Sequence, residues 1–137
     1  MTVKIDPDPT LKRNLMAFGR EFDAGWNSLV DELIKKLDVL PDEIEILQLK
    51  EKFGQLRCYI AGGSDDAHDI ITEYEHYSEH ICEYCGEFYT AKEHLSHGWV
   101  KTLCDKCAKK WENGTLYESK WKKFWRLLLY KLTGKYW

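Results

Sequence analysis

The sequence has few prolines and no long apolar run. Its 137 residues include three prolines and nine glycines, too few for a collagen-like or linker-dominated chain. No stretch approaches the roughly twenty apolar residues that span a bilayer. The opening residues, MTVKIDPDPT, also lack the apolar core of a secretory signal. We therefore expect a protein without a transmembrane segment, located in the cytoplasm, where thiols stay reduced.

The composition that remains is that of a globular protein. Hydrophobic residues make up 44% of the chain and charged residues 31%, so the hydrophobicity is too high for a disordered chain. The length predicts a single compact domain covering residues 1–137. Within it we distinguish a helix, hairpin and helix body (1–81), a zinc module (82–112) and a basic, aromatic C-terminal helix (113–137).

Four of the five cysteines form two Cys-x-x-Cys pairs. The pairs are Cys82 with Cys85 and Cys104 with Cys107, and eighteen residues separate them. Two such pairs at this spacing are typical of a site in which four thiolates bind one Zn²⁺ ion with a structural role. Gly86 suits the left-handed backbone of a metal-binding knuckle. The alternatives are two disulfides in a secreted protein or two unrelated reduced pairs.

The hydrophobic pattern upstream of the cysteines predicts an α+β fold. Apolar residues recur at helical spacing from Thr10 to Leu40, as one bent helix or two helices that meet near residues 23–25. The period then changes to two over residues 44–60, which predicts a β-hairpin with Phe53 tucked against the following helix. Ser64 is the expected N-cap of that long second helix, which we extend to about Ile81.

The zinc module itself predicts a small hairpin followed by a helix. We expect strands over residues 87–91 and 99–103, a loop over residues 92–98, and a helix from Asp105 to about Glu112. This order is that of a treble clef, and a zinc ribbon is the alternative. His80 lies near enough to the first pair to be an alternative ligand or a hydrogen-bonding neighbour of one.

The C-terminal segment differs in charge from the rest of the chain. Residues 1–99 hold 10 Lys and Arg against 20 Asp and Glu, a net charge of −10, whereas residues 100–137 hold 10 against 3, a net of +7. A helix over residues 116–132 would carry one apolar face formed by Trp121, Phe124, Trp125, Leu128, Leu129 and Leu132. We expect this tail to dock on the acidic body or to form a homodimer.

Three segments resemble a group of short, mostly uncharacterised zinc-binding proteins of bacteriophages and prophages. They are Gly25-Trp26 with Leu29 and Leu33, the K-E-K-F-G-x-L-R-x-Y pattern of residues 50–59, and the zinc segment with its G-W-V-K-T-L-C stretch at residues 98–104. The resemblance covers residues 25–109 and implies a small α+β domain in a bacterial host cell, with no established activity. The chain departs from that group in its tail after Asn113.

We expect the protein to have no enzymatic activity. HNH nucleases also use treble-clef zinc sites, but there a His follows the second cysteine pair, whereas Ala108 follows Cys107 here. His94 and His97 lie between the pairs without an adjoining Asp. Four thiolates also close the zinc shell and leave no position for an activated water.

The resemblance favours an accessory factor that binds a host or phage protein and inhibits a host enzyme or defence system. We expect the role of the hairpin to be mainly structural. The alternative is that its charged edge binds the partner. The candidate contact residues are Glu51, Lys52 and Arg57 on the hairpin and Lys120, Lys122, Lys123 and Arg126 on the tail. The competing hypothesis is a nucleic-acid-binding zinc protein, whose basic tail neutralises phosphates and stacks tryptophans on bases. A membrane-surface role for the tail is a further alternative.

Overall fold

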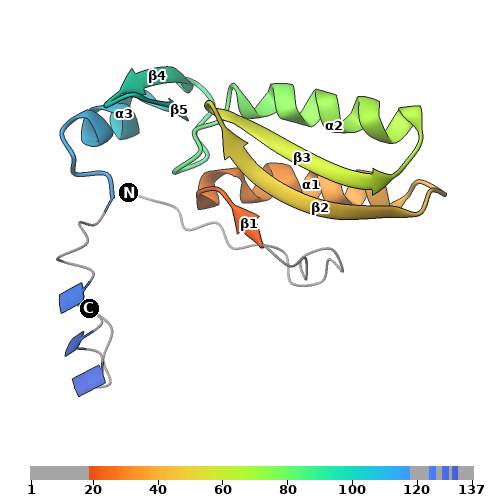
Figure 1. The fold of residues 1–137 in the computed structure, drawn as a ribbon. Helices are drawn as coiled ribbons and strands as arrows, with labels where there is room; N and C mark the ends of the chain where they lie inside the picture. Colours follow the sequence, from red (N-terminus) through yellow and green to blue (C-terminus); the bar gives the residue numbers. More distant parts are fainter. Residues whose placement is uncertain (1–18, 118–123, 126–127, 130, 133–137) are drawn as a thin grey trace.

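The computed structural model describes residues 19–117, 124–125, 128–129 and 131–132. The described residues form a mixed α+β fold with three α-helices and two small sheets (Figure 1). The predicted helix before residue 19 and most of the predicted tail helix lie outside the described residues. Among the residues described, no helix has the length and apolar character needed to cross a membrane.

The first element that the structure describes is a short strand, at a position where the sequence predicted a helix. Strand β1 (Arg20–Glu21) pairs in parallel with β2 (Ile44–Lys52). The 3-10 turn η2 (Ala24–Trp26) and helix α1 (Asn27–Asp38) follow. The prediction of helix over residues 20–22 is therefore wrong, whereas the break expected near residues 23–25 is confirmed. The guanidinium of Arg20 donates to Asp31 at 2.6 Å, and this contact holds β1 beside α1.

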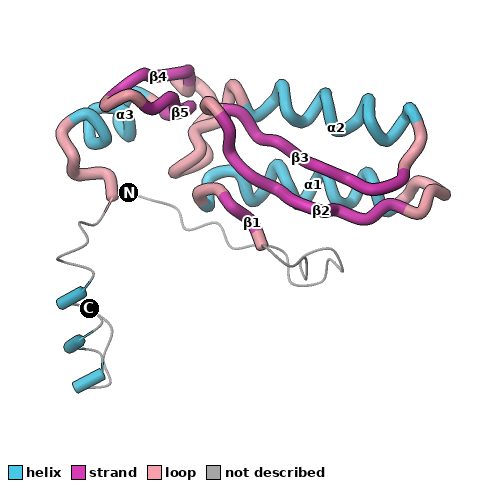
Figure 2. Tube along the Cα trace, viewed as in Figure 1, coloured by secondary structure: helices cyan, strands magenta, loops and turns pink. Residues whose placement is uncertain are grey.

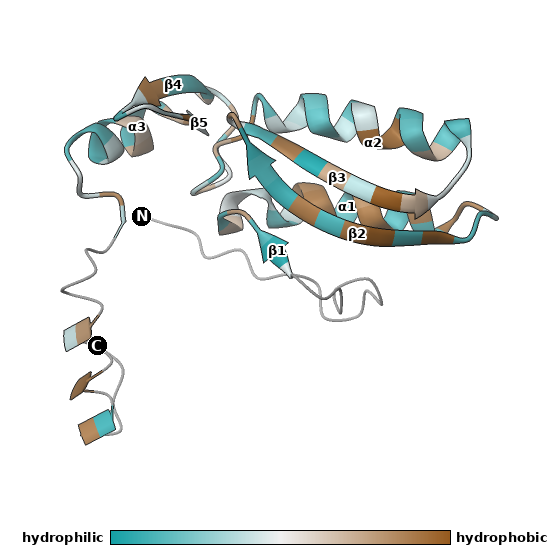
Figure 3. Cartoon of the chain, in the orientation of Figure 1, coloured by the Kyte–Doolittle hydropathy of each residue, from teal (hydrophilic) through white to brown (hydrophobic). Residues whose placement is uncertain are grey.

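The main sheet has one buried face and one open face. Strand β2 pairs antiparallel with β3 (Gln55–Gly62), and the inward side chains of the two strands pack against α1 and α2 in one core. Apolar and polar residues alternate along both strands (Figure 3). A register shift between Ile46 and Gln48 marks a bulge at Leu47, which is 46% exposed. The bulge explains why the apolar positions of β2 change phase there.

Helix α2 (Asp65–Ser78) begins as predicted and ends earlier. The Ser64 hydroxyl accepts a hydrogen bond from the Ala67 amide at 3.4 Å and donates one to Asp42 at 2.5 Å, so the expected N-cap is confirmed. The helix ends before Ile81, because residues 79–81 bond their amides to carbonyls only three positions back. Tyr77 of this helix is 44% exposed.

Side chains of α2 cover the outer edge of β3. The Leu56 amide donates to the Ser78 hydroxyl at 2.9 Å, and the Cys58 amide donates to the Glu75 carboxylate at 3.1 Å. A strand edge with free amides is a template for pairing with another chain. Here helix side chains use these two amides, so the sheet cannot be extended at this point.

The second sheet lies at the turn end of the main hairpin (Figures 1 and 2). Strands β4 (Lys92–Ser96) and β5 (Trp99–Leu103) pair antiparallel, and helix α3 (Asp105–Glu112) follows as predicted. The expected strand over residues 87–91 is wrong. The Glu87 carboxylate accepts from the amide of Thr90 at 3.0 Å and from its hydroxyl at 2.7 Å, which forms a turn in that segment. A two-residue turn then replaces the expected seven-residue loop.

Candidate metal centre

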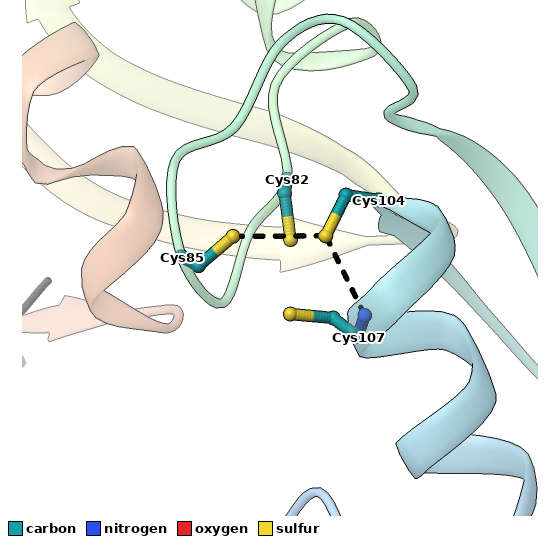
Figure 4. Close-up of side chains that lie close together, drawn as sticks. All are labelled: Cys82, Cys85, Cys104 and Cys107. Carbon is teal, nitrogen blue, oxygen red and sulfur yellow. Dashed lines mark hydrogen bonds between the residues drawn. The ribbon is translucent and has the colours of Figure 1, made fainter. Parts of the chain in front are cut away.

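The two cysteine pairs come together as predicted. Cys82 and Cys85 lie on the loop after α2, and Cys104 and Cys107 lie at the start of α3, with all four side chains pointing toward one another (Figure 4). Their sulfur atoms all lie within 4.8 Å of one another. The Sγ atoms of Cys85 and Cys104 are 3.7 Å apart. A tetrahedral ion with metal–sulfur bonds of about 2.3 Å needs sulfurs about 3.8 Å apart, so the cluster can hold a metal ion.

The first pair sits on a tight backbone knuckle. The Gly86 amide donates to the Cys82 carbonyl at 2.9 Å, and the Cys82 amide donates to the Glu87 carbonyl at 2.7 Å. Gly86 has a φ of +83°, a left-handed conformation that glycine adopts without strain. The prediction made for Gly86 is therefore confirmed, and the knuckle directs both sulfurs to one side.

The second pair uses the first turn of α3. Cys104 is the N-cap residue, and its sulfur accepts a hydrogen bond from the Cys107 amide at 3.4 Å. Burial acts to raise the pKa of the Cys104 thiol, but hydrogen bonds from the Cys107 amide and the neighbouring thiols outweigh it and lower that pKa. The start of the helix therefore favours the thiolate form of Cys104, which is the form that binds metals.

The other buried thiols resist ionisation until a cation binds. Burial raises the pKa of Cys82 to about 11 and also raises that of Cys107 above its ordinary value. A metal ion must therefore displace protons from these two sulfurs, so metal binding is coupled to proton release. None of the five cysteines forms a disulfide, and Cys58 lies apart from the cluster, in the main core.

The cluster is largely closed off from solvent. Cys82, Cys104 and Cys107 are buried and Cys85 is half-buried. Four thiolates complete a tetrahedral shell and leave no open coordination position for a water or a substrate. His80 is exposed and, within the described part of the chain, does not belong to the cluster. The structure thus gives no support to the alternative ligand considered for this site.

Glu83, between the first two ligands, connects the knuckle to the body. Its side chain is 2% exposed. The carboxylate accepts from the Asp23 amide at 3.1 Å and from the Lys101 ammonium at 3.3 Å. Burial raises its pKa to about 7, although Lys101 opposes that change. Sequence reasoning missed this residue, because the middle positions of a Cys-x-x-Cys pair carry no signal for burial.

The backbone of Glu83 forms a second connection. Its amide donates to the Thr102 carbonyl at 2.9 Å, and its carbonyl accepts from the Gly25 amide at 2.7 Å. A Cβ at Gly25 would lie 2.3 Å from the Cys82 carbonyl oxygen and 2.4 Å from that of Glu83. The Trp26 indole donates to the Ile81 carbonyl at 2.8 Å. The Gly25-Trp26 pair is therefore needed for close packing of the body against the knuckle.

The turn of the main hairpin forms the third connection. Phe53 and Gly54 both have positive φ, at 52° and 78°. The Thr102 hydroxyl donates to the Gly54 carbonyl at 2.5 Å, and a Cβ at Gly54 would meet Thr102 and Val100 at 3.3 Å. This contact gives the K-E-K-F-G pattern a physical role, because its glycine fits against β5.

The predicted partner-binding residues of the hairpin do not share one face. Lys50 pairs across the strands with Arg57, and Lys52 follows two positions later, so these three side chains lie on the open face. Glu51 has the opposite phase, and its carboxylate accepts from the Gly54 amide at 3.2 Å. Phe53 is 71% exposed, so the prediction that it packs against α2 is wrong.

The four predicted tail residues lie outside the described residues; they are Lys120, Lys122, Lys123 and Arg126.

Comparison of the chain with family models, with curated proteins and with solved structures finds no match. The class of protein is therefore defined by the described residues alone. They show a small α+β protein with a four-cysteine cluster that can hold a metal ion.

Proposed function

We propose that the four cysteines bind one Zn²⁺ ion and that its role is structural. Four thiolates in a tetrahedral arrangement are the ligand set typical of structural zinc. The site joins a knuckle, the β4–β5 hairpin and the start of α3, which is the order of elements in a treble clef. A zinc ribbon would place the second pair on a hairpin, and here that pair lies on a helix.

We further propose that the protein is a non-enzymatic accessory factor that binds another protein. The observation that carries this proposal is a cleft of about 350 Å³ between the two hairpin turns, lined by Glu51, Lys52, Phe53, Gly98, Trp99 and Val100. Phe53 is 71% exposed and Trp99 is 60% exposed. Exposed aromatic side chains beside a cleft are typical of binding hot spots, because they bury a large area with few rotamers to fix.

The metal centre fixes the geometry of this cleft. Phe53 comes from the main hairpin, whereas Trp99 belongs to β5, the strand that leads directly to Cys104. A hydrogen bond of 2.5 Å from the Thr102 hydroxyl to the Gly54 carbonyl connects the two hairpins. The zinc module therefore forms one wall of the cleft. A metal ion that stabilises this module would also keep that wall in position.

The resemblance to phage proteins supports a host or phage protein as the partner. Binding would take place in the bacterial cytoplasm and would inhibit a host enzyme or defence system. The tail is a second candidate surface for a partner or a homodimer. Its described side chains Phe124 and Leu132 are 56% and 74% exposed. Binding of nucleic acid through the basic tail is the outcome that the experiment must distinguish.

The proposal is tested by photocrosslinking in bacterial cells. A photoreactive benzoylphenylalanine replaces Phe53 in one variant and Val39, which is 82% exposed, in the control. We expect a discrete crosslinked protein at position 53 and none at position 39. Crosslinks that form only to nucleic acid, or equally at both positions, would overturn the proposal.

A further inference from the structure

We propose that the cleft and the adjoining open face of the hairpin bind a short acidic peptide segment with one large apolar side chain. This inference rests on the protein-binding function proposed above and adds the chemistry of the partner. The apolar side chain enters the cleft between Phe53 and Trp99. The partner's carboxylates contact the cations on the open face of the hairpin.

The cations form a compact group beside the cleft. Lys50 lies directly opposite Arg57 in the strand register, and Lys52 is on the same face of β2. Lys52 also lines the cleft. The cationic face and the apolar cleft are therefore continuous, and one extended segment can contact both.

Within the described part of the chain this group has ring contacts and no ion pair, although Glu21 lies beside Lys50 in the strand register. The ammonium of Lys50 lies 5.6 Å from the centre of the Tyr59 ring, and that of Lys52 lies 5.8 Å from the centre of the Phe53 ring. Contacts with rings hold the cations in place without cancelling their charge.

Arg57 adds a directional donor to the face. Its Nε atom is buried without a hydrogen-bond partner among the described residues. Buried nitrogen donors normally have a partner, and a guanidinium pairs best with a carboxylate through two parallel hydrogen bonds. A carboxylate of the partner would pair with the outer nitrogens of this guanidinium, because Nε itself is inaccessible to solvent.

The surroundings favour a short acidic segment over a long polyanion. Glu21 lies beside Lys50 in the strand register, and Glu51 is in the wall of the cleft. Residues 1–99 carry a net charge of −10. A nucleic acid that continues past the three cations would meet these negative charges, whereas a peptide with two or three carboxylates matches the cationic group.

The test is selection of binders from a displayed library of short random peptides, with the intact zinc-loaded protein as the target. We expect the recovered peptides to be enriched in Asp and Glu around one Trp, Phe or Leu. Recovered peptides without acidic residues, or with basic ones, would overturn the inference. Tighter binding of a single-stranded oligothymidylate, dependent on the same residues, would also overturn it and would favour nucleic acid.

Matched variants locate the binding site. Lys50→Gln, Lys52→Gln and Arg57→Gln combined should weaken the best acidic peptide at least tenfold and reduce its salt dependence, whereas Lys36→Gln with Lys109→Gln should not. Phe53→Ser with Trp99→Ser should weaken it similarly, and Tyr89→Ser, at an 85% exposed position, should not. Unchanged zinc content and melting temperature exclude misfolding. Equal effects of test and control variants would contradict the assigned site.

The two proposals can fail separately. If the crosslink at position 53 forms but no acidic peptide is selected, the partner chemistry is wrong and the protein-binding function stands. If neither the crosslink nor any peptide binder is obtained, the protein-binding function itself is wrong.

Discussion

Glu83 is the residue that connects the metal centre to the rest of the molecule most directly. Its carboxylate and backbone together contact Asp23, Gly25, Lys101 and Thr102. Tyr117, just after α3, also donates a hydrogen bond to the Asp23 carboxylate, and burial raises the pKa of that tyrosine above its ordinary value. These contacts form a polar junction between the knuckle and the body, at the edge of which Tyr117 is 39% exposed.

Replacing Glu83 by Gln should destabilise the fold by about 1–3 kcal/mol. The amide keeps one acceptor, so either the Asp23 amide or the Lys101 ammonium loses its buried partner. Urea denaturation measures the loss, and Glu93→Gln, at an exposed position of β4, should change the stability by less than about 0.5 kcal/mol. Adding Lys101→Met to Glu83→Gln should recover part of the loss. A Glu83→Gln variant as stable as the parent would show that the junction is not needed.

Single residues differ in how well the sequence predicts them. The four cysteines and Gly86 were predicted because metal geometry dictates their spacing and backbone. Glu83 was not, because its burial depends on contacts with residues 23 and 101 that are distant in sequence. Phe53 was misplaced for a related reason, since its positive φ puts the side chain outside the apolar phase of the strand.

At the level of elements, the main hairpin joins the body to the zinc module through its turn. Helix α1 after the break, the two strands and the start of α2 follow from local patterns of apolar residues and caps. Local patterns do not predict the bulge at Leu47 or the parallel strand β1, because both depend on pairing between separate segments. The β4 strand was misplaced because the Glu87–Thr90 hydrogen bonds form a turn where the apolar pattern favours a strand.

Phe53 and Gly54, the two residues at the turn of the main hairpin, should respond differently to substitution. Phe53→Ala removes a 71% exposed side chain and should change the stability by less than about 0.5 kcal/mol. Gly54→Ala places a Cβ at a φ of +78° and 3.3 Å from Thr102, and should cost about 1–2 kcal/mol or more. Urea denaturation of both variants checks this order. The reverse order would mean that Phe53 packs in the core after all.

For the whole molecule, the zinc module and the body depend on each other. Two of the three connections, through Glu83 and Gly25, reach the first knuckle, and the third, through Gly54, reaches β5 just before Cys104. A structural zinc ion contributes on the order of 10 kcal/mol to folding at neutral pH, which is comparable with the whole stability of a small domain. Loss of the metal should therefore destabilise the main hairpin and the cleft as well as the module.

The central claim is that Cys82, Cys85, Cys104 and Cys107 hold one zinc ion that the fold requires. The most direct measurement is the zinc content per chain together with the melting temperature, compared between the parent, Cys104→Ser and Cys58→Ser. We expect one zinc in the parent, none in Cys104→Ser with a sharply lower melting temperature, and one in Cys58→Ser, whose cysteine lies in the main core. A Cys104→Ser variant that keeps one zinc and the parent's melting temperature would contradict the account.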